Sequence, residues 1–452
     1  MLYSELLFIF AKQPAKLLIF GGSDNIIKKN FINSAQKTGG RPVCCCHYAV
    51  VMPKSVIFAL GISGIMAGVY IHIPFCASRC SYCNFFSTLQ LGERGAGYVE
   101  ALLAEARLRC HELGGESVFT LYMGGGTPSQ LPLPLLSRLV MGLKEILDLS
   151  HVEEFTIEAN PDDVTSEWSN CVKSLGVNRV SMGVQSFEDK ILRFVGRRHT
   201  AGQVTEAMNH LRKSGIDNIS IDLIYGLPGQ TVESWTDTVR QAINLKPWHI
   251  SAYGLTYEEG TRLWHQRERG EVIEVPEEQC LDMYRVMVKL LRQAGYEHYE
   301  ISNFALPGRY SRHNSSYWND TPYLGLGAAA HSYDGRVRSS NLCDLQEYIS
   351  KVMAGTPVNE QEELTLYQRY DERVMLGLRT SHGVDAERLH EDFGDVAWHH
   401  FIREAQRHID AGNLKQAEGS RYVLTADGIM LSDSVIRDLM WDEYVAVLKP
   451  CR

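Results

Sequence analysis

The sequence predicts an α/β fold made of parallel β-α units, followed by a smaller α+β domain. From Val69 onward, short runs of apolar and β-branched residues alternate with longer stretches whose apolar residues recur at helical spacing. Strands and helices that alternate in this way indicate parallel βαβ units. The chain has 452 residues, of which 44% are hydrophobic and 22% charged. This composition allows a large core and excludes a disordered, collagen-like or polytopic membrane protein.

The elements of the first part follow one another in regular order. Six such repeats form a barrel or an open sheet, and in both architectures ligands bind where the strands end. The polar motifs described below fall at such strand ends. The strands are expected at Val69–Ile73, Thr120–Met123, Phe155–Ala159, Arg179–Val184, Ile219–Tyr225 and His249–Leu255. The helices between them are expected at Tyr98–Glu112, Leu133–Leu147, Val164–Leu175, Gln203–Lys213 and Val232–Asn244.

The first 65 residues differ from the rest in composition. They hold seven Lys or Arg and two acidic residues, a net charge of +5 that leaves −14 for the remainder. Three interpretations are open: a membrane anchor, a targeting leader, or sequence upstream of the true start. The apolar run from Val56 to Ile71 is shorter than the roughly 18–20 residues of a spanning helix, which weighs against an anchor. Because Met66 stands just before the first strand, we favour a start there.

Charge and cysteine content narrow the class of protein. The chain has 45 Lys and Arg residues and 54 acidic residues, a net charge of −9, so it lacks the overall positive charge that attracts nucleic acid. Eleven cysteines in a chain of this length are too sparse for a disulfide scaffold, and the odd number leaves at least one thiol unpaired. A reducing, cytoplasmic location is therefore expected.

Three cysteines, Cys76, Cys80 and Cys83, follow the first strand with the spacing C-x3-C-x2-C. Three thiolates on one short loop can each bind one iron of a cubane and leave the fourth iron open to an exogenous ligand. Zinc is the alternative metal, but a structural zinc site normally takes a fourth protein ligand. His72 lies inside the strand, and no second cysteine pair follows. Three buried thiols without a metal are the remaining alternative.

The cysteine motif after the first strand resembles the radical S-adenosylmethionine (SAM) superfamily. The span from Gly68 to the C-terminus resembles the branch that contains oxygen-independent coproporphyrinogen III oxidase and the HemW haem chaperones. This resemblance implies a radical-SAM partial (β/α)6 barrel, similar to a TIM barrel, with a small winged-helix-like α+β domain at the C-terminus. It also implies a 4Fe-4S cluster held by three cysteines and an exchangeable SAM. In the superfamily an electron from the cluster cleaves SAM to a 5′-deoxyadenosyl radical.

Two further segments match this branch at strand ends. Gly124–Ser129 follows the second strand, and glycines let backbone approach a ligand closely, although turns also use such runs. Glu158 ends the third strand, where a buried carboxylate is costly unless it meets a cation or hydrogen-bond donors. The resemblance assigns five residues to SAM: Tyr70, Gly125, Gly126, Thr127 and Glu158.

Another group lies on the fourth and fifth strands. Gln185 ends the fourth strand, Arg197 follows twelve residues later, and Asp222 lies in the fifth strand. The resemblance places these three residues, together with Tyr82, where the family holds a second SAM. The alternative for Gln185 and Asp222 is a hydrogen bond that ties one strand end to the next loop. The alternative for Arg197 is a surface ion pair.

The sequence departs from the oxidase after the cysteine motif. The oxidase continues C-x2-C-x-C, whereas Phe85 stands two residues beyond Cys83, as in HemW. Downstream, His313, Tyr317 and Trp318 belong to the H-N-x-x-Y-W signature of HemW. An imidazole beside two aromatic rings suits haem ligation or stacking on a porphyrin. The alternative is a packing role in a loop that closes the barrel.

Past Glu363 the pattern changes to that of a small domain. Tyr370–Arg379 and Ser432–Leu439 are expected as helices, and Tyr422–Leu431 as a two-stranded wing with a turn at Ala426–Gly428. This part resembles the winged-helix-like tail of the family. Basic residues are interspersed with acidic ones here, so a packing or partner-docking role is favoured over DNA binding.

Together these features predict four segments and a function. Residues 1–65 form an atypical extension, 66–300 the radical SAM barrel, 301–365 a barrel-closing segment, and 366–452 the C-terminal domain. The resemblance implies a cytoplasmic chaperone that carries haem as cargo to haem-dependent respiratory proteins, with an electron donor for the cluster. Peripheral membrane contact and a homodimer are compatible with this role. The alternative is an enzyme that oxidatively decarboxylates coproporphyrinogen III to protoporphyrinogen IX, and the missing cysteine argues against that activity.

Overall fold

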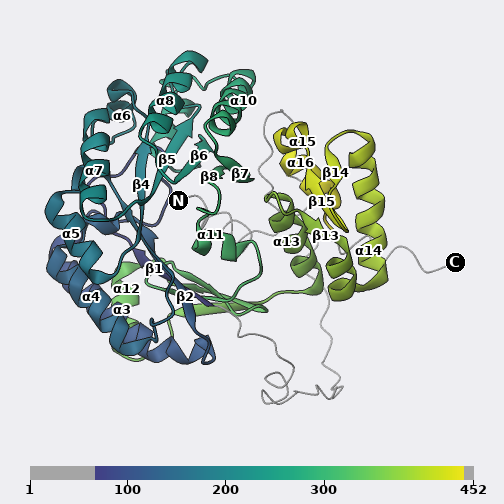
Figure 1. Cartoon of the computed structure of the whole chain (residues 1–452). Coiled ribbons are helices and arrows are strands. Elements are labelled where there is room, and N and C mark those ends of the chain that lie inside the picture. Colours follow the sequence, from purple (N-terminus) through teal and green to yellow (C-terminus); the bar gives the residue numbers. More distant parts are fainter. Residues whose placement is uncertain (1–66, 442–452) are drawn as a thin grey trace, which may run out of the picture. The chain divides into compact units, whose positions relative to one another are not determined.

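The computed structural model describes residues 67–441 (Figure 1). All six strands predicted for the first part are present, and helices separate them in the expected order. The elements are β1 (Ala67–Ile73), α3 (Leu91–Arg109), β2 (Val118–Gly125), α4 (Leu133–Ile146), β3 (Glu154–Ala159), α5 (Ser166–Leu175), β4 (Arg179–Gln185), α6 (Asp189–Phe194), α7 (Ala201–Lys213), β5 (Asn218–Tyr225), α8 (Val232–Asn244) and β6 (His249–Gly254).

The strands from β1 to β12 form one sheet, in the order β12-β11-β10-β9-β1-β2-β3-β4-β5-β6-β8-β7. β9 and β1 to β6 run parallel, whereas the strands at both edges are antiparallel. Because β12 and β7 do not pair with each other, the barrel is partial, as expected. The added elements are α9 (Arg262–Glu268), α10 (Glu277–Gln293), β7 (Glu297–Glu300), β8 (Asn303–Ala305), α11 (Arg312–Tyr317), β9 (Tyr323–Leu326), β10 (His331–Tyr333), β11 (Val337–Asn341), α12 (Leu345–Met353) and β12 (Asn359–Glu363).

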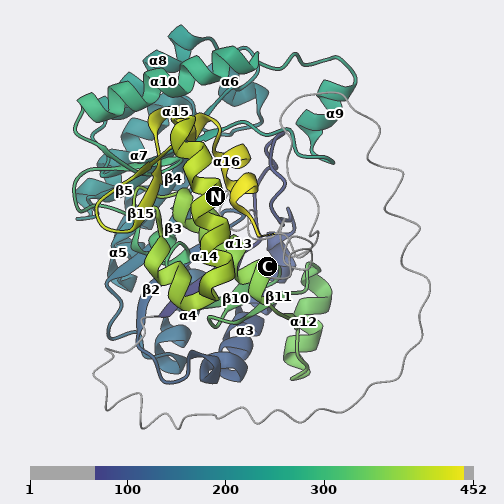
Figure 2. The ribbon, with the colours of Figure 1, turned by 90° about the vertical axis from the view of Figure 1, so that its right-hand side faces the viewer.

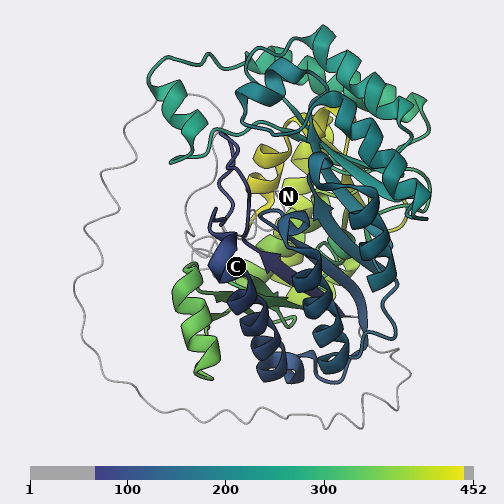
Figure 3. The same ribbon diagram turned by 90° about the vertical axis from the view of Figure 1, so that its left-hand side faces the viewer.

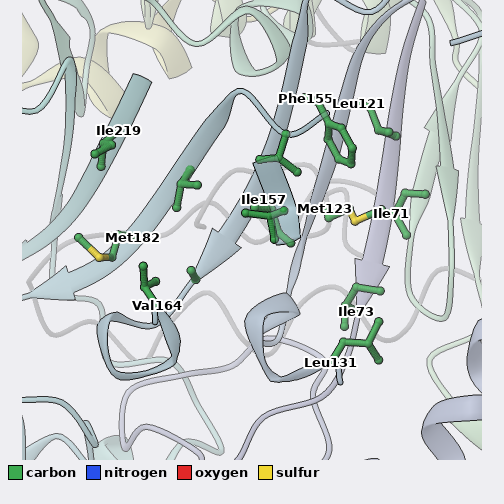
Figure 4. Packing of buried hydrophobic residues seen from close by; sticks show 14 of the residues in the cluster. Ile71, Ile73, Leu121, Met123, Leu131, Phe155, Ile157, Val164, Met182 and Ile219 are labelled. Carbon is green, nitrogen blue, oxygen red and sulfur yellow. The ribbon is translucent and has the colours of Figure 1, made fainter. Parts of the chain in front are cut away.

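The parallel strands have one apolar face and one polar face, because successive side chains of a strand point to opposite sides. Ile71, Leu121 and Ile157 belong to the apolar core that the sheet shares with its helices (Figure 4). The intervening positions carry polar groups, and they are aligned across the sheet by the strand register: Tyr70, Tyr122, Thr156, Arg179, Asn218. Helices line the outer side of the sheet (Figure 3) and pack on its apolar face, whereas the polar positions lie on the opposite face.

The short helix α11 packs against this polar face. The His313 ring stacks on Tyr122 with centroids 5.0 Å apart, and its backbone N–H donates to Glu154 Oε1 at 2.9 Å. Ser311 caps the helix by accepting a hydrogen bond from the backbone N–H of Asn314. The segment with the H-N-x-x-Y-W signature is thus a capped helix inside the polar side of the sheet.

Up to residue 441, the C-terminal part forms a three-stranded sheet with four helices. The strand order is β13-β15-β14, and both pairs are antiparallel. The helices predicted over Tyr370–Arg379 and Ser432–Leu439 are confirmed by α13 and α16. The elements are α13 (Leu366–Leu378), β13 (Val384–Asp385), α14 (Ala386–Asp410), β14 (Leu414–Gln416), β15 (Arg421–Leu424), α15 (Ala426–Met430) and α16 (Ser432–Leu439).

The predicted wing at Tyr422–Leu431 is wrong. Its first half is β15, but that strand pairs with β14, which precedes it in the chain. The expected turn at Ala426–Gly428 is the start of α15, because the Thr425 hydroxyl accepts a hydrogen bond from the Gly428 N–H at 3.0 Å. A threonine cap of this kind starts a helix.

No helix within residues 67–441 combines the length and the apolar character that crossing a membrane requires. The predictions for the first 65 residues, including a start at Met66, lie outside the described residues.

Candidate cofactor site

The loop that follows β1 carries Cys76, Cys80 and Cys83, and neighbouring segments hold it in place. The Cys76 N–H donates to the Thr88 carbonyl at 3.0 Å. Ser81, next to Cys80, donates to the Val195 carbonyl at 3.0 Å and accepts from the Leu263 N–H at 2.8 Å. The three cysteines form no disulfide within the described residues, and all three are partly exposed. The loop is therefore fixed by hydrogen bonds while its thiols stay accessible.

Two side chains donate hydrogen bonds to sulfur atoms of this loop. The Thr127 hydroxyl lies 3.4 Å from Cys76 Sγ, and Arg197 Nη1 lies 3.6 Å from Cys80 Sγ. Burial raises the pKa of the Cys76 thiol, and the Thr127 hydrogen bond opposes that rise. Donors and a nearby guanidinium favour the thiolate form, which is the form that binds metals.

Within residues 67–441, no three His, Cys, Asp or Glu side chains are arranged to hold a single metal ion. The loop supplies three thiols, whereas a structural zinc site normally takes four protein ligands. Three thiolates match a cubane that binds one thiolate on each of three irons and leaves the fourth iron open. The donor set of the loop therefore fits an iron-sulfur cluster better than zinc.

The glycine segment after β2 packs closely against the cysteine loop. The Gly126 N–H donates to the Ile73 carbonyl at 2.9 Å, and the Thr127 N–H donates to the Phe75 carbonyl at 2.8 Å. Gly125 has φ +108°, and a Cβ atom there would lie 2.4 Å from the His72 ring. These glycines are required by close packing, so their presence alone does not identify a ligand site.

Glu158 lies at the end of β3, beside the glycine segment. It accepts hydrogen bonds from the Tyr122 hydroxyl at 2.8 Å and the Gly125 N–H at 3.1 Å. Burial raises the pKa of this carboxyl group, although the Tyr122 hydrogen bond lowers it. Tyr70 stacks on Tyr122 with centroids 6.0 Å apart. Tyr70, Gly125 and Glu158 thus lie around one end of the polar face.

Arg197 lies between the cysteine loop and the ends of β3 and β4. Besides Cys80, its guanidinium donates to Asn160 Oδ1 at 2.6 Å and to the Gly183 carbonyl. The surface ion pair considered for Arg197 is made by its neighbour Arg198, with Asp162 and Asp163. Arg197 is therefore oriented toward the candidate site and not toward solvent.

Of the other residues of this group, Gln185 and Asp222 are buried and Tyr82 is partly buried. Gln185 ends β4 with φ +65°, at an irregularity in its pairing with β5. Asp222 accepts a hydrogen bond from the Ser181 hydroxyl at 3.3 Å, which joins β5 to β4 rather than a strand end to the next loop. Tyr82 packs against Ile191 and Val195, and its hydroxyl has no hydrogen-bond partner in the described part of the chain.

The haem contacts predicted in the H-N-x-x-Y-W signature lie on α11. Both ring nitrogens of His313 are used: Nδ1 is 2.8 Å from Thr120 Oγ1, and Nε2 is 2.9 Å from the Tyr317 hydroxyl. Burial lowers the pKa of His313 to about 3. Tyr317 also packs edge-on against Tyr323, with centroids 4.8 Å apart. Haem ligation by His313 would require these hydrogen bonds to break, so this geometry favours the packing alternative.

Sequence reasoning missed two residues of this region, His72 and Asn160. His72 Nδ1 lies 3.1 Å from the Tyr70 hydroxyl and Nε2 lies 3.0 Å from the Phe86 carbonyl, and burial lowers its pKa to about 4. The strand alternation places His72 on the same face as Tyr70 and could have identified it. Asn160 follows Glu158 by two residues, but its contact with Arg197 depends on tertiary packing.

Comparisons with known proteins agree with this fold. The family profile "Radical SAM superfamily" matches residues 70–242, and "HemN C-terminal domain" matches residues 364–431. The solved structure of the radical SAM enzyme coproporphyrinogen III oxidase (HemN) from Escherichia coli is similar, with a TM-score of 0.73 and 24% sequence identity. The match covers 87% of this chain and 94% of that protein.

Curated relatives are more similar in sequence. A protein named heme chaperone HemW from Lactococcus lactis is 37% identical, and the match covers 83% of this chain and 97% of the relative. HemW from Bacillus subtilis is 35% identical over 82% of this chain and 98% of its own length. HemW from Synechocystis is 34% identical over 82% of this chain and 95% of its own length. The chain therefore belongs to the HemW family of radical SAM proteins.

Proposed function

We propose that this protein is a cytoplasmic radical-SAM-type haem chaperone, which binds haem and transfers it to haem-dependent respiratory proteins. The observation that carries the proposal is the similarity, over 83% of the chain, to relatives named heme chaperone HemW. Phe85 supports it, because this buried aromatic residue occupies the position of the additional cysteine of the oxidase.

Cys76, Cys80 and Cys83 would hold the 4Fe-4S cluster. The fixed loop, its three partly exposed cysteines and the hydrogen bonds from Thr127 and Arg197 support this assignment. When bound, the cluster supplies single electrons, for which the protein needs an electron donor. The protein's own contribution is to favour the thiolates and to leave one side of the loop open to SAM.

The polar end of the sheet would bind SAM. Glu158 would accept hydrogen bonds from the cationic part of the ligand, and the glycine segment would offer its backbone groups. Arg197 would link this end to the cluster, because its guanidinium contacts both Cys80 and the β3–β4 ends. The complete set proposed for SAM is Tyr70, Tyr82, Gly125, Gly126, Thr127, Glu158, Gln185, Arg197 and Asp222.

An anaerobic experiment on the full chain tests the function. The reconstituted protein is titrated with haem by difference spectroscopy, and in parallel it is given coproporphyrinogen III, SAM and a reductant. We expect stoichiometric haem binding without decarboxylation, followed by haem transfer to an apo-cytochrome acceptor. Turnover to protoporphyrinogen IX would overturn the proposal and establish the oxidase activity. Absence of haem binding would also overturn it.

A further inference from the structure

The C-terminal domain carries two exposed histidines whose ring orientation is fixed by one aspartate. In α14, His399 Nδ1 lies 2.7 Å from the backbone carbonyl of Asp395. His390 Nε2 lies 2.6 Å from the carboxylate of the same Asp395. Both histidines are exposed, so these contacts do not serve to satisfy buried imidazoles. Each ring is instead held through one nitrogen, while the side chain as a whole stays exposed.

The hydrogen bond of His399 determines its tautomer. A carbonyl oxygen only accepts hydrogen bonds, so Nδ1 carries the proton and Nε2 holds a free electron pair when the ring is neutral. An Nδ1–H bonded to a backbone carbonyl is the arrangement that orients metal-ligating histidines and raises their basicity. His399 is thus prepared to donate an electron pair from Nε2 without releasing a proton.

An aromatic ring lies beside both imidazoles. Trp398 is 5.3 Å from the His390 ring and 4.9 Å from the His399 ring, between centroids. Trp398 is only half-buried, and Val396 nearby is 65% exposed. The surface around His399 therefore offers apolar contact as well as a nitrogen ligand, which a solvated metal ion does not need but a porphyrin does.

Two arginines lie on the same side of α14 as His399. Arg403 and Arg407 follow His399 at intervals of four residues, so they lie on one stripe, roughly 6 and 12 Å further along the axis. Their side chains are 49% and 71% exposed, although both also contact Glu404. Guanidinium groups pair well with carboxylates, and haem carries two propionates. Figures 1 and 2 show α14 as the long helix of this domain.

We propose that haem docks on α14, with the iron ligated by His399 Nε2, the macrocycle against Trp398, and the propionates near Arg403 and Arg407. This inference rests on the proposed haem-chaperone function. It supplies an amino-acid ligand for the haem iron, which His313 does not offer because both its ring nitrogens are hydrogen-bonded within the protein. A single imidazole suffices as the protein ligand of haem iron.

Haem titration of full-length variants tests the site. We expect His399→Ala to lower haem affinity at least tenfold and to abolish the imidazole-iron signature in resonance Raman and electron paramagnetic resonance spectra. Added free imidazole should restore that signature. Iron and sulfide content should stay unchanged, since no cluster cysteine lies in this domain. His382→Ala is the matched control, because His382 is an exposed histidine of the same domain.

The outcomes separate this inference from the function on which it rests. If the wild-type protein binds no haem, both the proposed chaperone function and the proposed haem site on α14 are wrong. If the wild type binds haem and His399→Ala binds it with the same affinity and spectrum, only the site is wrong. Loss of the signature in His313→Ala, with His399→Ala unaffected, would likewise overturn the site and return the ligand to α11.

Discussion

Glu158 combines burial with two hydrogen-bond donors, and this combination makes it a sensitive probe of SAM binding. Burial raises the pKa of its carboxyl group, because it disfavours the charged form. A cationic ligand beside Glu158 would stabilise the ionised carboxylate and would in turn be bound by its charge. We expect Glu158→Gln to weaken SAM binding about tenfold or more, as loss of a charged hydrogen-bonding group does. Equilibrium dialysis with labelled SAM measures the affinity.

Cluster content in the same variant is the accompanying control, since Glu158 accepts its hydrogen bonds from Tyr122 and Gly125 of β2 and not from the cysteine loop. Iron and sulfide per chain should equal those of the wild type. SAM affinity that stays the same in Glu158→Gln would leave this carboxylate with a structural role only, as acceptor for Tyr122 and Gly125.

The three motif cysteines give a second prediction. We expect the Cys76→Ala, Cys80→Ala, Cys83→Ala triple variant to lose the brown colour and the iron and sulfide of anaerobically reconstituted protein, because a cubane needs a thiolate on each of three irons. Absorption spectroscopy and metal analysis measure this.

Three other cysteines provide a matched control. Cys110, Cys171 and Cys280 are also free and partly exposed, but they lie outside the loop. Their combined replacement by Ala should leave the cluster intact. Retention of the cluster in the motif variant, or its loss in the control variant, would contradict the ligand assignment.

Single-residue roles were predictable from sequence only where spacing carries the chemistry. The C-x3-C-x2-C spacing and the position of Glu158 at a strand end were visible without coordinates. The hydrogen bonds of His313 were not, because Thr120 lies far away in the chain and reaches the ring only through tertiary packing. The same holds for Arg197, whose neighbour Arg198 makes the surface ion pairs that the sequence allowed for either residue.

Helix α3 is joined to the edge strands by a buried polar network. Glu105 is 1% exposed and accepts from Arg109 Nη1 at 2.8 Å, Asn341 Nδ2 at 2.7 Å, the Gly327 N–H at 2.8 Å and the Tyr348 hydroxyl at 2.5 Å. The network connects residues more than 200 positions apart. It therefore fixes the segment around β9 against the first helix of the barrel.

We expect Glu105→Ala to lower the free energy of unfolding by about 3 kcal/mol, because it leaves several buried donors without their acceptor. Arg109 keeps its ion pair with Glu112, so its charge is not left unpaired. Urea denaturation of the cluster-free chain measures this. The Glu105→Ala, Arg109→Ala double variant should lose less than the sum of the single variants, as coupled residues do.

The exposed pair of Arg138 and Glu100 is the comparison for this network, because both side chains are nearly half exposed. Glu100→Ala should change stability little, since exposed ion pairs contribute little. Equal effects of Glu105→Ala and Glu100→Ala would show that the buried network does not hold the edge strands.

The elements that sequence patterns predicted are those with strong periodicity, such as the six parallel strands. Helix α11 carries the polar sequence RHNSSY and has no apolar stripe, so its helical state depends on the Ser311 cap and on Glu154. The wing was mispredicted because Thr425 starts a helix where the Asp-Gly sequence suggested a turn. β9 pairs with β1 despite the intervening length of chain, and short-range patterns do not encode such pairing.

The barrel and the C-terminal domain meet through backbone and charge contacts. The Ile301 N–H donates to the Arg379 carbonyl at 3.0 Å, and the Ser381 N–H donates to the Tyr299 carbonyl at 2.9 Å. Arg338 and Glu372 form a mostly buried ion pair across the same boundary. These contacts couple the two parts, so a buried titratable group at the boundary affects the stability of both.

Glu300 is such a group, and it predicts how stability changes with pH. Its side chain is buried and hydrogen-bonded to Asn303, and its backbone forms an isolated β-bridge with Thr380. Burial raises the pKa of the Glu300 carboxyl group from the ordinary 4.5 to about 8. The folded state therefore binds a proton that the unfolded chain releases near pH 4.5. The stabilisation from this protonation is complete below pH 4.5 and is lost as the pH rises toward 8.

We expect the Tm of the cluster-free protein to fall between pH 5.5 and pH 8.5, and Glu300→Gln to flatten that fall because the amide needs no proton. Part of the fall should remain in the variant, since burial also raises the pKa of Glu372 to about 7. Glu360→Gln, at an exposed position of β12, is the control and should follow the wild-type curve. If Glu300→Gln loses as much Tm as the wild type over this range, the proton on Glu300 does not stabilise the boundary between the two domains.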